Sequence, residues 1–216
     1  RIIHRQSPEK TTYAELVQLA GNPTPSAPEL SEKLNRLFTT PFIRNKSVIP
    51  PQFQEHPMLG DSLRITMWNV EQSTNAGAIA RVLRDPSSFD KLFSGGNRPP
   101  NPSWDDARRQ LKVLRSSDVV LLQEVDIGHP RSGYLDVPEH LAEAWNMNYA
   151  YGVQYLEVDP AYLGTGDGHI KNQDSLPRVR SVTPDRQDSY HGLFGCAVLS
   201  RFPIKRVQVV PLQGVN

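Results

Sequence analysis

A short apolar run that ends in acids constrains the fold of this chain of 216 residues more than any other feature. Residues 118–126 read DVVLLQEVD, in which four aliphatic residues are followed by Gln123, Glu124 and Asp126. An apolar run of this length between polar residues is typical of a strand that is covered on both faces. We therefore predict a buried strand whose polar end requires a separate explanation.

Strand-like and helix-like patterns alternate from residue 63 onward. LRITMWNV at 63–70 alternates apolar and polar residues, as a strand does. Helical spacing of apolar residues follows at 76–83 and again after Ser103, and Asp136 with Glu139 resembles a capping box for a further helix. These patterns predict an α/β fold.

The last third of the chain predicts three more strands. MNYAYGVQYLEV at 147–158 is one of them, and GLFGCAVLS at 192–200 with IKRVQVVPL at 204–212 predicts a hairpin. Alternate residues of the strand at 147–158 are expected to share one face, namely Tyr149, Tyr151, Val153 and Tyr155.

The domain organisation follows from changes in composition. Residues 1–60 contain two short helix-like stretches, Tyr13–Leu19 and Glu29–Phe38, between proline-rich connectors, which predicts an N-terminal extension to a main domain at 61–216. The segment 159–192 is rich in Gly, Asp, Pro and Ser. A connection of this length is usually a lid, a binding loop or a disordered insertion.

Composition excludes several classes of protein. The net charge of +1 gives no broad basic surface for nucleic acid, although a local basic groove stays possible, and no apolar window is long enough for a membrane span. Cys196 is the sole cysteine, so no internal disulfide forms, and its apolar neighbours predict a buried thiol. We expect a soluble protein with no evident obligate protein partner. Its localisation stays open, because Arg1 is the first residue and export with the leader absent is compatible with that start.

Candidate chemistry gathers where two strands end. Period-two alternation places Asn69 and Glu71 on the same face of one strand as Ile65 and Met67. It places Glu124 and Asp126 in one row with Val120 and Leu122 on the other strand. Adjacent strands would bring these groups to one rim of a sheet, where α/β proteins commonly bind ligands. Because close carboxylates repel one another, a hard divalent cation such as Mg²⁺ is a natural partner, although polar residues at strand ends are also commonplace.

Four segments in order resemble the endonuclease/exonuclease/phosphatase family: WNVE at 68–71, LLQEVD at 121–126, the stretch 131–152, and GLFGCAVLSRFPI at 192–204. The resemblance spans roughly residues 63 to 212, and the ordered set is more specific than any single motif. It implies a four-layer α/β sandwich of two mixed β-sheets flanked by helices. It also implies hydrolysis of a phosphoester by activated water, with Mg²⁺ or Mn²⁺ as cofactor.

The resemblance implies roles for three residues. Glu124 is similar to the family's metal-binding glutamate, and Asn69 to its asparagine that helps to hold the metal and the scissile phosphate. Glu71 lies where some members carry a second acid near the metal. The substrate classes compatible with this chemistry are nucleic acid, phospholipid and nucleotide conjugates.

The family's Asp-x-Asn and Ser-Asp-His motifs do not occur in residues 1–216. On this resemblance we expect 61–216 to be the N-terminal portion of the domain, with an incomplete sandwich, unpaired sheet edges and no catalytic activity alone. The alternative is a noncatalytic binding module on the same fold. Leu193–Cys196 also departs from the family's usual Leu-His-Gly-Asn, which puts substrate contacts there in doubt.

Two other residues are weaker candidates for substrate binding. Arg131 could meet an anionic substrate, although loop arginines are usually solvated. His191 borders the long loop, although such a histidine is more often hydrogen-bonded than catalytic. No histidine pair has the spacing of a zinc site.

Overall fold

The computed structural model describes residues 5–47, 54–56, 60–93, 103–164 and 182–210. The strands are β1 (Arg5–Gln6), β2 (Phe42–Arg44), β3 (Gln54–His56), β4 (Gly60–Ser62), β5 (Ile65–Asn69), β6 (Val119–Ile127), β7 (Asn148–Leu156) and β8 (Leu193–Ser200). The helices are α1 (Tyr13–Gly21), α2 (Pro28–Thr39), α3 (Ala76–Arg84), α4 (Ser103–Arg115), α5 (Val137–Trp145) and α6 (Pro160–Leu163). Short 3₁₀ turns lie at Glu71–Ser73, Pro86–Phe93, Pro130–Ser132 and Pro184–Ser189.

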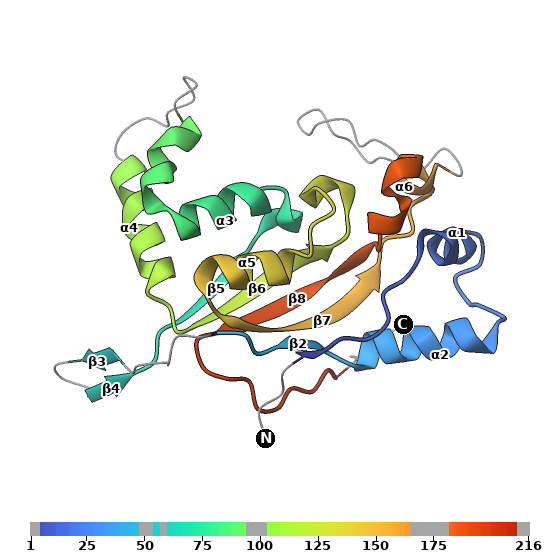
Figure 1. Ribbon diagram of the computed structural model, residues 1–216, viewed down its shortest axis with the longest axis horizontal. Helices are drawn as coiled ribbons and strands as arrows, with labels where there is room; N and C mark the ends of the chain where they lie inside the picture. Colours follow the sequence, from blue (N-terminus) through green and yellow to red (C-terminus); the bar gives the residue numbers. More distant parts are fainter. Residues whose placement is uncertain (1–4, 48–53, 57–59, 94–102, 165–181, 211–216) are drawn as a thin grey trace.

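One mixed sheet of six strands organises the molecule, in the order β1-β2-β7-β8-β6-β5. The β5–β6 pair is parallel and every other pair in this sheet is antiparallel. Helices flank the sheet, and Figure 1 shows α3, α4 and α5 on one side of it. The predicted α/β class is confirmed. Among the described residues the other strand pairing is β3 with β4, so the second large sheet of the expected sandwich is not part of what the structure describes.

The N-terminal segment is joined to the main sheet. The two predicted short helices are α1 and α2, and Thr12 with Glu15 forms a capping box that starts α1. β2 pairs with β7, and β1 pairs with β2. Residues before position 60 therefore extend the same sheet that carries the acids, while the boundary near residue 60 remains a prediction.

The main hydrophobic core lies between the sheet and the helices. Alternate residues of β6 point into it, including Val120 and Leu122, both nearly inaccessible to solvent. Tyr149 and Tyr151 of β7 enter the same core, and the hydroxyl of Tyr151 donates to the carbonyl oxygen of Val125 at 3.1 Å. That bond satisfies a polar group in an otherwise apolar interior.

The other face of the β5–β6–β8 region is open. Ile65, Met67 and Val198 are exposed there. Cys196 precedes Val198 by two residues on β8 and is exposed as well, so the prediction of a buried thiol was wrong. The residues directly before and after Cys196 are buried on the covered face of the sheet. Because side chains alternate along a strand, Cys196 itself lies on the open face.

Two β-bulges interrupt the predicted alternation. The β6 register shifts between Leu122 and Val125, and the β7 register shifts between Val153 and Tyr155. Each bulge inserts a residue opposite β8, so the side chains beyond it change faces. Glu124 and Asp126 therefore do not continue the row of Val120 and Leu122, and Tyr155 leaves the row of Tyr149 and Tyr151 to stack on Phe194, with ring centroids 4.5 Å apart.

The predicted hairpin after β8 does not form within the described residues. Residues 204–210 have no strand partner, and 211–212 lie outside the described part. Ile204 instead exchanges backbone bonds with the Asn45 side chain, at 2.8 and 2.9 Å. The long predicted loop contains α6 and the turn Pro184–Ser189, while 165–181 lie outside the described residues. No helix within the described ranges has the length and apolar character needed to cross a membrane.

Candidate functional site

The acids lie where the parallel β5–β6 pair ends. Asn69 is the last residue of β5 and pairs with Gln123 of β6. The N–H of Val70 still donates to the carbonyl oxygen of Gln123 at 3.1 Å, and the chain then leaves the sheet through the turn Glu71–Ser73. The pairing of β5 with β6 thus ends just before Glu124, and the polar groups of the two neighbouring strands meet there, as the sequence predicted.

The backbone at this edge adopts an uncommon conformation. Glu71, Gln72 and Ser73 have φ values of 51°, 52° and 59°, and Glu124 in the β6 bulge has φ 59°. Each non-glycine residue in the left-handed region costs on the order of 1–3 kcal/mol and persists only where surrounding contacts hold it. Such strain is often found at functional sites.

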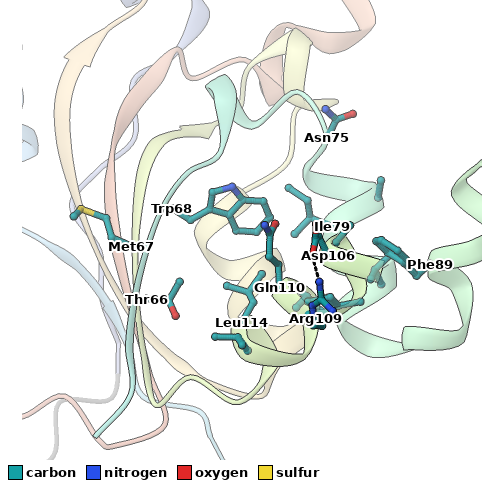
Figure 2. Close-up of a pocket in the computed structure, with 16 residues that line it drawn as sticks. Thr66, Met67, Trp68, Asn75, Ile79, Phe89, Asp106, Arg109, Gln110 and Leu114 are labelled. Atoms are coloured by element: carbon teal, nitrogen blue, oxygen red, sulfur yellow. Dashed lines mark hydrogen bonds and ion pairs between the residues drawn. The ribbon is translucent and has the colours of Figure 1, made fainter. Parts of the chain in front are cut away.

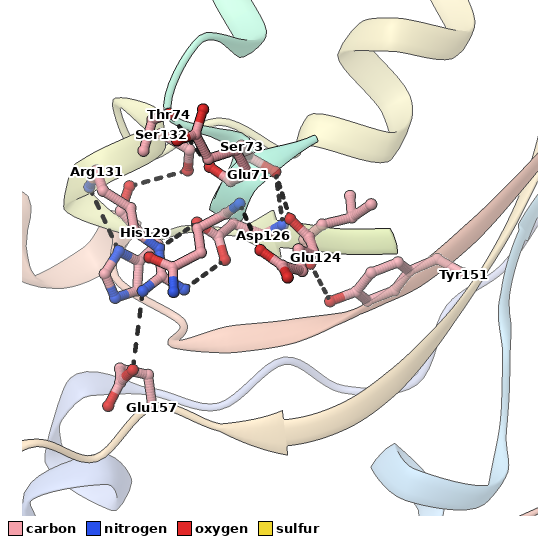
Figure 3. A network of polar contacts seen from close by, with 12 residues as sticks. Glu71, Ser73, Thr74, Glu124, Asp126, His129, Arg131, Ser132, Tyr151 and Glu157 are labelled. Carbon is pink, nitrogen blue, oxygen red and sulfur yellow. Dashed lines mark hydrogen bonds and ion pairs between the residues drawn. The ribbon is translucent and has the colours of Figure 1, made fainter. Parts of the chain in front are cut away.

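Asn69 and Glu124 are in direct contact. They belong to the region of polar contacts that Figure 3 shows around Glu71 and Glu124. The Asn69 Nδ2 donates to Glu124 Oε1 at 2.7 Å, and the N–H of Gln72 donates to Glu124 Oε2 at 3.2 Å. The N–H of Glu71 donates to Asn69 Oδ1 at 2.9 Å. A backbone N–H needs the amide oxygen and a carboxylate needs the amide nitrogen, so these two neighbours together determine the orientation of the Asn69 amide.

These groups suit a hard divalent cation. Mg²⁺ is usually held through one or two carboxylates, with water and substrate phosphate completing its shell. Each Glu124 oxygen accepts one hydrogen bond and keeps a further lone pair, and Glu71 has an exposed side chain on the adjoining turn. Within the described ranges no group of three or more His, Cys, Asp or Glu residues could hold a metal. A site here would therefore depend on two carboxylates with help from the Asn69 amide.

Asp126, two residues after Glu124 in β6, forms a buried ion pair with Arg131. Arg131 Nε and Nη2 donate to the two carboxylate oxygens of Asp126, each at 2.8 Å, and Arg131 Nη1 lies 3.9 Å from Glu157 Oε2. Burial raises the pKa of Asp126 to about 6, although Arg131 opposes the shift. Figure 3 shows Arg131 between Asp126 and Glu157. The guanidinium is thus engaged by carboxylates of the protein, and its predicted role in substrate binding remains a prediction.

His129 is fully buried beside this pair. Burial, with a smaller effect of Arg131, lowers the pKa of His129 to about 3, so the ring is neutral at pH 7. Its Nδ1 accepts from the N–H of Arg131 at 3.3 Å, which leaves the proton on Nε2. The ring packs against Tyr162 and Tyr190, with centroids 4.6 and 5.9 Å away.

His191, the other predicted substrate-binding residue, contacts the N-terminal segment. Its Nδ1 lies 2.9 Å from the carbonyl oxygen of Thr11, and the Thr11 hydroxyl donates to the carbonyl oxygen of His191 at 2.6 Å. Burial lowers the pKa of His191, which favours the neutral ring. The structure therefore brings Asn69, Glu71 and Glu124 together and gives His191 a contact elsewhere.

Sequence reasoning missed Ser73. This residue is fully buried, its hydroxyl donates to the carbonyl oxygen of Glu124 at 3.2 Å, and it accepts from the N–H of Asp126 at 3.1 Å. No sequence signal marked it, because both contacts depend on the β6 bulge and the left-handed turn.

A cavity of about 1020 Å³ lies away from these acids, between α3, α4 and β5 (Figure 2). Its walls include Trp68, Ile79 and Leu114, and the ion pair of Asp106 with Arg109 lies at its lining. The cavity is mainly apolar and contains none of the candidate site residues. The candidate ligands therefore lie at the end of the β5–β6 pairing and not in this cavity.

Comparison with protein-family models found a match over most of the chain. The model of the endonuclease/exonuclease/phosphatase family matches residues 68–216, which include Asn69, Glu71 and Glu124. No curated protein matches the chain. No solved structure matches it. The chain belongs to the endonuclease/exonuclease/phosphatase family, whose members are hydrolases that act as nucleases and phosphatases.

Proposed function

We propose that the protein is a divalent-metal-dependent phosphoesterase that uses water to hydrolyse a phosphodiester or phosphomonoester. Glu124 is the principal ligand of Mg²⁺ or Mn²⁺, Glu71 is a second acid near the metal, and Asn69 contacts the metal and the scissile phosphate. The observation that carries the proposal is the 2.7 Å bond between Asn69 and Glu124 where the pairing of β5 with β6 ends.

The charge of the substrate explains why such a pair is useful. Phosphate esters repel nucleophiles, and a divalent cation held at Glu124 would offset negative charge on a phosphate oxygen. Asn69 orients Glu124 through one amide hydrogen. Its second Nδ2 hydrogen is available to donate to a phosphate oxygen.

The proposed substrates share a phosphoester and differ in the group that it carries. Nucleic acid, phospholipid and nucleotide conjugates all belong to this class, because Asn69 and Glu124 address the phosphate alone. The three residues come from one chain, so the proposal requires no second protein at the site.

Metal titration tests the assignment of Glu124. Mn²⁺ binding by the 216-residue chain, followed by electron paramagnetic resonance, should be lost in Glu124→Gln and retained in Glu29→Gln. The control changes an exposed acid on α2 in the same chemical way. Equal Mn²⁺ binding by the wild type and Glu124→Gln would remove Glu124 from the site.

Hydrolysis in the full-length protein tests the reaction. Glu124→Gln there should abolish Mg²⁺-dependent cleavage of a generic phosphodiester, and unchanged cleavage would contradict the proposal. Mn²⁺ binding without any turnover by the full-length wild type would favour the noncatalytic binding module.

A further inference from the structure

The edge of β6 that faces β5 loses its strand partner before β6 ends. The last backbone bond across this edge is the one from Val70 to Gln123, and β6 continues to Ile127. The Glu124 carbonyl and the Asp126 N–H therefore lie beyond the reach of β5. Buried backbone groups of this kind need other partners.

Ser73 supplies both partners with one hydroxyl. Its Oγ donates to the Glu124 carbonyl oxygen at 3.2 Å and accepts from the Asp126 N–H at 3.1 Å. The hydroxyl thus takes the place of the next residue of a strand. Ser73 is fully buried, so water does not compete for these two bonds.

The turn that carries Ser73 also holds the Glu124 side chain. The N–H of Gln72 donates to Glu124 Oε2, while Ser73 bonds to the Glu124 main chain. The turn Glu71–Ser73 therefore holds both the main chain and the carboxylate of Glu124. Glu124 and Ser73 both have φ 59°, so the contact joins two residues in the left-handed region that each need outside support.

We infer that Ser73 is a positioning residue of the site. Its buried hydroxyl holds the β6 bulge in the shape that presents the Glu124 carboxylate to a divalent cation. This inference rests on the proposed function, because it concerns how the same carboxylate is held.

Two substitutions separate the hydroxyl from the backbone conformation. Ser73→Ala removes both hydrogen bonds and keeps a Cβ at φ 59°. Ser73→Gly removes the same bonds, while glycine adopts this φ without strain. Loss of a group that orients a metal ligand typically weakens metal affinity about 10–100-fold. We expect both variants of the 216-residue chain to weaken Mn²⁺ binding about tenfold, as measured by electron paramagnetic resonance.

Ser117→Ala is the matched control. Ser117 is also fully buried, and its hydroxyl bonds to the hydroxyl of Thr66 at 2.6 Å, at the opposite end of the β5–β6 pair. This variant should lower the thermal unfolding midpoint and leave the Mn²⁺ dissociation constant within twofold of the wild type. A similar loss of affinity in Ser117→Ala would show that general destabilisation explains the result and would overturn the inference.

The remaining outcomes distinguish this inference from the proposed function. Wild-type affinity in Ser73→Gly would show that the hydroxyl does not position Glu124, even if Ser73→Ala binds weakly. Loss of Mn²⁺ in Glu124→Gln with unchanged affinity in both Ser73 variants would overturn the inference and leave the proposed function in place. Failure of the wild type to bind Mn²⁺ would overturn the proposed function itself.

Hydrogen exchange on the wild type provides a measurement that does not depend on the variants folding. If Glu124 coordination and the bulge are linked, saturating Mg²⁺ should slow exchange of the Asp126 and Gln72 amides. Unchanged exchange at both amides, with bound Mg²⁺ demonstrated by calorimetry, would overturn the inference.

Discussion

The two ends of the β5–β6 pair are built differently, although a buried serine ties each end. At the start of β6, the N–H of Asp118 donates to the carbonyl oxygen of Arg64 at 2.9 Å, and Asp118 Oδ2 accepts from the N–H of Arg64 at 2.8 Å. Described residues at this end do not adopt positive φ values. At the other end, Ser73 meets Glu124, and both residues are in the left-handed region.

The difference indicates where this fold gives up local stability. Regular pairing at the start of the strands satisfies the backbone without strain. At the end that carries the acids, the backbone bends to aim the Glu124 carboxylate, and a few buried polar contacts hold the bend. Strain concentrated beside candidate ligands is consistent with a functional site.

The largest expected loss of stability comes from breaking the buried ion pair of Asp126 with Arg131, next to the strained end. Arg131→Met would leave Asp126 buried without its partner, and breaking such a pair typically costs about 3–5 kcal/mol. Urea unfolding at pH 7 measures this loss. Arg109→Met is the control, because its pair with Asp106 is exposed and should contribute less than about 1 kcal/mol. Equal losses in the two variants would contradict a special role for the buried pair.

A smaller loss is expected at the regular end. Asp118→Ala removes the acceptor for the Arg64 N–H and should cost about 1–3 kcal/mol of unfolding free energy. Mn²⁺ affinity should stay within twofold of the wild type, because the change is at the opposite end from Glu124. A tenfold weaker affinity would show that the two ends are coupled and would break the comparison.

The pH dependence of stability should reveal the buried imidazole. The pKa of His129 falls from 6.5 to about 3 on folding, so the unfolded state binds the extra proton between these values and stability rises with pH there. Asp126 acts oppositely between about pH 4 and 6, since its raised pKa makes the folded state bind more protons. The useful quantity is the unfolding free energy of the wild type minus that of His129→Gln. Asp126 is present in both proteins, so its contribution to this difference is reduced.

The difference in unfolding free energy should then change by up to about 1.4 kcal/mol per pH unit between pH 4 and 6. Urea unfolding at pH 4, 5 and 6 measures it. His140→Gln is the control, because His140 is only partly buried. A flat difference for His129→Gln would mean that the ring is not held neutral.

The smallest effect on stability is expected at Glu71. Its side chain is exposed, so Glu71→Gln should change the unfolding free energy by less than about 0.5 kcal/mol. Mn²⁺ affinity should fall several-fold, because one of two carboxylates loses its charge. The exposed Glu32→Gln on α2 is the control. Unchanged affinity in Glu71→Gln would restrict the site to Glu124 and Asn69.

Local pattern was sufficient for much of the fold and for the central contact of the site. The α/β class, α1, α2 and the buried strand β6 were all predicted from apolar spacing. The convergence of Asn69 with Glu124 was predicted too, because neighbouring strands that both end in polar residues place them at one rim. These features depend on short-range periodicity, which a sequence displays directly.

Tertiary structure decided what happens after the periodicity breaks. The bulge at Glu124 moved Asp126 out of the predicted row and into contact with Arg131. Residues 204–210, the described part of the strand expected after Pro203, did not pair. The contacts of Ser73 with β6 likewise depend on a left-handed turn that no residue type in the sequence predicted. The sequence alone determined which polar groups arrive at the strand ends, since strand period and burial are local properties. Their aim was decided by the three-dimensional fold, because a bulge and a buried hydroxyl act only between segments about fifty residues apart in the chain.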